Sequence, residues 1–276
     1  MKMNPTPRTT ARQATPRARM LVLATALLLP FGMSDTAWAQ AVAPATTAAP
    51  ASANVINPGA IAALKNMGLY LRTLKSFTVR AESTIDEVLE SGQKIQFAST
   101  VNLKARLPDR LRMDLKSDAK ERELYYDGKT ITQYAPRLKY YASVPAPGTV
   151  RESLIAAASK YDLGLPLADL FFWATDASSL EGIKSGIYIG PAMVAGLECD
   201  HYAFRQEGVD WQIWIRSGKT PLPCKLLVTT VDLPEQPQYA TTLHWDVTTA
   251  VADKTFTFVP PKDARKIEFP PVVAAK

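Results

Sequence analysis

The chain has 276 residues, 47% of them hydrophobic, with two cysteines and two histidines. Its formal net charge of +6 lies mostly in the first 39 residues, which hold five of the 32 basic residues and one of the 26 acidic ones. The rest of the chain carries 27 basic and 25 acidic residues, a net charge of +2. This near balance removes the main argument for nucleic acid, so we expect no nucleic acid partner.

Residues 1–39 show the three parts of a secretory signal peptide. Basic residues precede a short apolar run, Met20–Phe31, and Ala37-Trp38-Ala39 is a small-x-small cleavage site. The run is about twelve residues long, whereas about twenty are needed to cross a bilayer. We therefore expect a periplasmic protein that is cut after Ala39 and has no transmembrane span in its mature form. The alternative is a retained N-terminal anchor.

Residues 40–56 follow as a predicted disordered linker, because the stretch QAVAPATTAAPASA has few residues that can be buried. Residues 57–276 then have the size of a single domain. Asn57 and Pro58 are a cap and first-turn pair for a helix. One face of this helix is apolar at helical spacing, with Ile61, Leu64, Met67, Leu71 and Leu74.

From Phe77 onward the hydrophobic period changes to two, which predicts two long one-sided strands around residues 77–86 and 95–104, joined near Gly92. Shorter strands follow around 111–115, on both sides of the hairpin signal Asp127-Gly128, and in RLKYYASV. With no room for crossover helices between them, these strands predict an antiparallel meander.

Two helical segments interrupt the strands. TVRESLIAAASKYDLG predicts a short helix ending near Gly164, and LPLADLFFW predicts a second, strongly apolar helix that starts at Pro166. This second segment is more apolar than a surface helix needs. It either packs on the concave side of the sheet or covers a pocket there. Strands then resume in five stretches, GIYIGPAMVAGLECDHYAFRQ, VDWQIWIRS, LPCKLLVTTVD, QYATTLHWDV and a short FTFV.

The stretch CDHYAFRQEGVDWQIWI has the residue types of an active site, but it reads as a hairpin around Glu207-Gly208. The predicted cross-strand pairs are Phe204 with Trp211, Tyr202 with Ile213, Asp200 with Ile215, Ala203 with Gln212, His201 with Trp214, and Cys199 with Arg216. Because adjacent residues of a strand point to opposite faces, Asp200 and His201 cannot form an acid-base pair.

Neither histidine, His201 or His244, lies in a nucleophile elbow, and no HExxH or Cys/His metal spacing is present. We therefore expect no catalytic residue, no metal site and no cofactor. His201 is interpreted as a packed sheet histidine, with ligand contact and catalysis as alternatives.

The exported location favours a bond between Cys199 and Cys224. They are predicted on strands two apart, however, near 9 to 10 Å, beyond the roughly 7 Å limit of a disulfide. We therefore expect no bond.

The stretches SFTVRAESTIDEVLESGQKIQF, PDRLRMDL, YYDGKTITQYAPRLKYY, LPLADLFFW, CDHYAFRQEGVDWQIWI, PLPCKLLVTT and FTFVPPKDA together resemble a known family. The layout resembles the periplasmic lipoprotein carriers LolA and LolB, and more closely the periplasmic family called domain of unknown function 2092. The resemblance covers about residues 60 to 268. It implies an α+β fold: a curved antiparallel sheet, or unclosed β-barrel, with an N-terminal helix and a helical lid insertion.

The resemblance and the apolar insertion favour a non-catalytic binding or carrier protein for a lipid, an acyl chain or a lipoprotein. The predicted lid residues are Leu167, Leu170, Phe171, Phe172 and Trp173, and the predicted wall residues are Phe97, Val101, Met113 and Tyr126. All of them can also be ordinary core. The alternatives are an envelope module that binds protein partners through the rim of its sheet or its tyrosine-rich strands and, with least support, a hydrolase.

Overall fold

The structure, a computed structural model, describes residues 55–146, 148–161, 163, 165–173 and 180–269. The predicted signal peptide and nearly all of the predicted linker, up to residue 54, lie outside the described residues. Among the residues described, no helix has the length and apolar character needed to cross a membrane.

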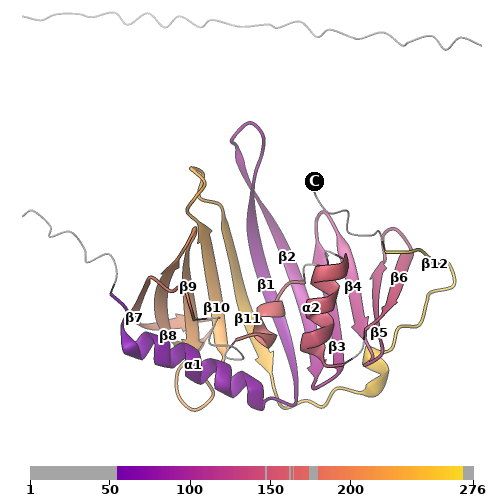
Figure 1. Cartoon of the computed structure of the whole chain (residues 1–276), viewed down its shortest axis with the longest axis horizontal. Coiled ribbons are helices and arrows are strands. Elements are labelled where there is room, and N and C mark those ends of the chain that lie inside the picture. The colour runs from indigo at the N-terminus through magenta and orange to yellow at the C-terminus, as the bar shows by residue number, and fades with distance from the viewer. Residues whose placement is uncertain (1–54, 147, 162, 164, 174–179, 270–276) are drawn as a thin grey trace, which may run out of the picture. The chain divides into compact units, whose positions relative to one another are not determined.

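One sheet of twelve strands carries the fold (Figure 1). Its first run pairs in chain order and comprises β1 (Ser76–Val88), β2 (Lys94–Arg106), β3 (Arg110–Ser117), β4 (Glu121–Tyr126), β5 (Thr130–Ala135) and β6 (Tyr140–Pro145). The second run comprises β7 (Ser185–Val194), β8 (Leu197–Gln206), β9 (Val209–Arg216), β10 (Pro223–Thr230) and β11 (Gln238–Asp246).

Antiparallel pairing of β1 with β11 joins the two runs into one unclosed sheet. β7 forms one end, and the two-residue strand β12 (Arg265–Lys266) forms the other. The predicted unclosed antiparallel sheet is therefore confirmed, with one difference. β12 pairs with β6 in the parallel direction. It follows β11, which pairs with β1 in the middle of the sheet, so the chain crosses several strands to reach this edge.

The period-two pattern places the core on one face of the central strands. Phe77, Val79 and Ala81 on β1 are buried, whereas Ile85 near the end of the strand is 46% exposed. β1 and β2 pair over their whole length, from Ser76 opposite Arg106 to Val88 opposite Lys94. The long hairpin is therefore one-sided as predicted, and its buried part is the half that lies next to the helices.

Helix α1 (Pro58–Thr73) begins where the sequence predicts, because the Asn57 side chain accepts a hydrogen bond of 2.7 Å from the Gly59 amide. Helix α2 (Val150–Tyr161) begins with a capping box, in which Thr149 and Glu152 exchange side-chain and backbone hydrogen bonds. Both helices contribute buried residues to the same main hydrophobic cluster, which includes the inner residues of the central strands. In Figure 1 both lie in front of the sheet.

Two predicted elements differ from the structure. The segment 165–173 contains only a short 3-10 helix, η1 (Ala168–Phe171), because Leu167 adopts a left-handed conformation with φ of 64° and prevents a helix from starting at Pro166. Gly164, the predicted end of the preceding helix, lies outside the described residues.

The predicted strand FTFV is also wrong: its first residue ends the 3-10 helix η3 (Asp253–Phe256). Phe256 enters the core, while Phe258 packs among Tyr125, Tyr134 and Tyr141. The two phenylalanines alternate as in a strand, but they pack into separate sites and no ladder forms there.

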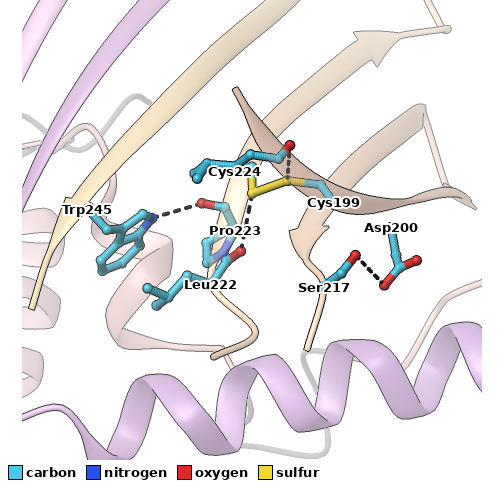
Figure 2. Close-up of a disulfide and its surroundings, with 8 residues drawn as sticks. Cys199, Asp200, Ser217, Leu222, Pro223, Cys224 and Trp245 are labelled. Atoms are coloured by element: carbon cyan, nitrogen blue, oxygen red, sulfur yellow. Dashed lines mark hydrogen bonds between the residues drawn. A yellow bond between two sulfur atoms is a disulfide. The ribbon is translucent and has the colours of Figure 1, made fainter. Parts of the chain in front are cut away.

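The expectation that Cys199 and Cys224 stay unpaired is wrong, since they form a disulfide between β8 and β10 (Figure 2). Their Cα atoms are 7.1 Å apart, closer than regular strands two apart would place them. Cys199 lies opposite Arg216, the last residue of the intervening β9. Cys224 lies at a register shift between Pro223 and Lys225. Such an irregularity bends a strand, which brings the two cysteines within reach of each other.

Candidate functional site

The hairpin of β8 and β9 has the predicted register at all six expected pairs. His201 stacks on Trp214, with 4.1 Å between ring centroids, and its Nε2 lies 2.9 Å from Gln212 Oε1. Asp200 instead accepts hydrogen bonds from the hydroxyls of Tyr188 and Ser217, each 3.1 Å long. The two neighbours thus have separate partners. His201 is the packed sheet histidine that was expected.

An apolar cavity lies between the end of α1, the start of α2 and η1. It has a volume of about 430 Å³, which falls within the range of small-molecule sites, about 300 to 1,000 Å³. Its apolar lining comes from four separate stretches of the chain, with Leu71, Leu74, Phe77, Leu107, Pro108, Val150, Leu170, Phe171 and Trp173. We call this space the α1–α2 cavity.

Three of the five predicted lid residues line this cavity, namely Leu170, Phe171 and Trp173. Leu170 is buried, and the two aromatic residues are partly buried. The Phe171 ring packs 6.0 Å from that of Phe77 on β1. The other two predicted lid residues, Leu167 and Phe172, are partly buried against the main hydrophobic cluster and do not line the cavity.

A second, smaller cavity of about 200 Å³ adjoins the first, since Trp173 lines both. α1 contributes Leu64 and Met67 to its wall, and Trp211 comes from β9. Asp169 also lines this second cavity and reaches solvent. The apolar surroundings raise the pKa of its carboxyl above the ordinary value, because partial burial disfavours the charged form.

The four predicted wall residues do not line either cavity. Val101, Met113 and Tyr126 are buried in the core. The Tyr126 hydroxyl donates a hydrogen bond of 2.6 Å to the Gly148 carbonyl, which satisfies its polar atom. Phe97 is partly exposed on the outer part of β2, opposite Ile85. The sequence pattern placed three of these residues on the buried face of the sheet, but it could not distinguish a cavity wall from a filled core.

Sequence reasoning missed the cations of the α1–α2 cavity. Arg72, Lys75 and Arg151 line it together with the apolar residues. They come from the last turn of α1, the link to β1 and the first turn of α2. They could not be predicted from the sequence, because they are far apart along the chain and no local motif connects residues 72 and 151.

Two arginines of the sheet, Arg112 and Arg80, contact carboxylates and do not line this cavity. Arg112 on β3 contacts the carboxylates of Asp114 and Glu123 and stacks over the Tyr125 ring at 4.1 Å. Arg80 pairs with Glu82 at 2.6 Å in an exposed ion pair. Within the described part of the chain, no group of three or more histidine, cysteine, aspartate or glutamate side chains could hold a metal ion.

The chain belongs to the family described as a predicted periplasmic protein, DUF2092, whose model matches residues 60–270. This is the family that the sequence resembles, and membership identifies the chain as a periplasmic protein. A comparison with curated proteins found no match.

Three solved structures are similar to this chain. Lipoprotein LppX of Mycobacterium tuberculosis is 12% identical with a TM-score of 0.45, over 71% of this chain and 100% of that one. A chain of the Pseudomonas aeruginosa MucA/MucB complex is 16% identical with a TM-score of 0.38, over 72% and 61%. A LolA superfamily protein of Nitrosomonas europaea is 9% identical with a TM-score of 0.31, over 72% and 97%.

Proposed function

We propose that this chain is a non-catalytic periplasmic binding or carrier protein for a hydrophobic ligand, such as a lipid or the acyl chain of a lipoprotein. The observation that carries the proposal is the α1–α2 cavity, a space of about 430 Å³ with a mostly apolar lining that includes Leu170, Phe171 and Trp173. The three residues belong to the segment whose apolar composition exceeds what a surface element needs. An open apolar lining of this kind is a feature of ligand sites.

The energetics support an acyl chain as ligand. Burial of each methylene contributes about 0.8 kcal/mol. A chain that buries about eight methylenes would therefore gain roughly 6 kcal/mol before the entropic cost of association. Most of the lining side chains are apolar and would make van der Waals contacts with the tail. We therefore expect the cavity to discriminate little between acyl chains of different structure.

The test is displacement of a fluorescent apolar dye by palmitate from the mature protein. We expect displacement in the wild type, and affinity about ten-fold lower in Phe171→Ala and in Trp173→Ala, because each loses a large apolar contact. Phe97→Ala is the matched control, since this partly exposed aromatic lies outside both cavities. Equal palmitate affinity in all four proteins would contradict the proposal.

A second candidate is an envelope module that binds a protein partner. The edge strand β7 favours it, because Ile187, Tyr188, Ile189 and Met193 are between 41% and 66% exposed and edge strands can pair with an added strand. The tyrosine-rich stretch that first suggested this function is less available, since Tyr125, Tyr134 and Tyr141 surround Phe258. A lipid-free protein that displaces no dye and captures a partner through β7 would favour this candidate.

A further inference from the structure

A separate groove lies between α2 and the strands β5 and β6, with a volume of about 420 Å³. Most of its lining side chains are apolar or small. The strands contribute Ile131, Val144 and Pro145, and α2 contributes Ser153, Ala156 and Ala157. Among the residues that the structure describes, none lines both this space and the α1–α2 cavity. We call this space the α2–β6 groove.

The last strand of the chain leads towards this groove. β12 lies beside β6 (Figure 1) and pairs with it in parallel, with Arg265 opposite Tyr140. The Ile267 amide then donates a hydrogen bond of 2.8 Å to the Tyr141 carbonyl. Because parallel strands advance in the same direction, the chain after β12 follows β6 towards Val144. It therefore runs along the strand that forms one wall of the groove.

Phe269, the last residue of this part of the described chain, lies at one end of the groove. Its ring centroid is 5.2 Å from that of Tyr161, which ends α2 and lines the groove. The sequence that follows, residues 270–276, is PPVVAAK. Two prolines favour an extended backbone, and the next four residues are apolar and of modest size. Their composition therefore matches the walls of the groove.

The length and the polarity of the groove also agree with this segment. From Glu152 to Tyr161, α2 rises about 14 Å at 1.5 Å per residue, whereas seven extended residues span about 23 to 25 Å. Ser153 is 1% exposed, and its Oγ has no hydrogen-bond partner among the described residues. A peptide brings backbone donors and acceptors to such a groove, whereas an acyl chain brings none. These features favour a peptide segment as the occupant.

We propose that residues 270–276 dock in the α2–β6 groove of their own chain, with Val272 and Val273 against Ala156 and Ala157. The docked segment runs from the end of α2 towards its start and connects this helix to the edge of the sheet through β12. α2 also forms one side of the α1–α2 cavity, so docking fixes a helix that borders both spaces. This inference does not depend on the proposed carrier function.

The experiment is nuclear magnetic resonance of the full mature chain with labelled alanine and valine methyl groups. We expect nuclear Overhauser contacts between the methyls of Val272 or Val273 and those of Ala156 or Ala157. Ala156→Glu places a charged side chain in the groove, so these contacts should be lost and the two valine signals should move to their positions in the free peptide PPVVAAK. Ala158→Glu, at an exposed position of α2 outside the lining, is the matched control and should keep the contacts.

A second variant tests the same contact from the other side. Val272→Asp with Val273→Asp changes no residue of the core, and it should shift the methyl signals of Ala156 and Ala157 because their apolar neighbours are removed. Unchanged alanine signals in this variant, or wild-type valine signals at the free-peptide positions, would overturn the proposal.

Other occupants of the groove give different results. In a mixture of one population labelled only at alanine and another labelled only at valine, contacts between the two labels would assign the groove to a second copy of the chain. Palmitate that shifts the Ala156 and Ala157 signals and leaves Val272 unchanged would assign it to an acyl ligand. Either result would overturn docking of the chain's own segment.

Discussion

Removal of the Cys199–Cys224 disulfide is expected to lower the free energy of unfolding by about 3 to 4 kcal/mol. The bond closes a loop with a sequence separation of 25 residues, and in the chain-entropy model a loop of this length accounts for roughly that loss. For a domain of this size, each kcal/mol corresponds to about 2 to 4 °C in Tm. Calorimetry of Cys199→Ala with Cys224→Ala should therefore show a Tm lower by roughly 6 to 16 °C.

The disulfide prediction has an internal control. Reducing agent should lower the Tm of the wild type towards that of the double variant, and should leave the double variant itself unchanged. Both cysteines are almost fully buried, in a small cluster with Val194, and Trp214 packs against it. A double variant with wild-type Tm would show that the bond adds no stability to the junction of β8 and β10.

Phe256→Ala is expected to lower the free energy of unfolding by about 3 to 5 kcal/mol, the range for large-to-small changes at buried aromatic residues. Phe256 is fully buried and stands at the end of η3, where it attaches the C-terminal segment to the core. The Arg106 guanidinium lies 5.5 Å from the centroid of its ring. Denaturant titration of the variant should show a lower midpoint with a similar slope.

Val259→Ala is the matched control for this change, because Val259 lies three residues further along and is 78% exposed. Its free energy of unfolding should stay within about 0.5 kcal/mol of the wild type. If Phe256→Ala also left the free energy of unfolding within about 0.5 kcal/mol of the wild type, burial of this side chain would not hold the C-terminal segment to the core.

Much of the fold could be predicted from periodicity. The Asn57-Pro58 start of α1, the alternating β1–β2 hairpin and every pair of the β8–β9 register follow from local sequence, because turn residues and apolar spacing determine them together. These elements agree because each strand has one buried face, and a shift by one residue would expose it.

The disulfide could not be predicted from the same reasoning. The expected distance between the two cysteines assumed flat and regular strands. The register shift at Cys224 and the end of β9 at Arg216 depend on how three strands bend together. This bending cannot be predicted from a local sequence pattern. The same limit applies to Phe256, whose spacing with Phe258 resembles a strand although the two rings pack into different sites.

Three of the nine predicted site residues line the α1–α2 cavity. Hydrophobicity singled out Leu170, Phe171 and Trp173, which line the cavity together. The cations Arg72 and Arg151 were not predicted, because the fold brings them to one cavity from two helices. Apolar segments can be found from composition, whereas a cavity lining made from distant residues requires the topology.

The most direct test of the account is a crystal structure of the mature protein with palmitate at saturating concentration. We predict continuous density for the tail in the α1–α2 cavity, in contact with Phe171 and Trp173. Density for palmitate only at another surface, with the α1–α2 cavity filled by protein side chains, would contradict the claim that this cavity is the ligand site.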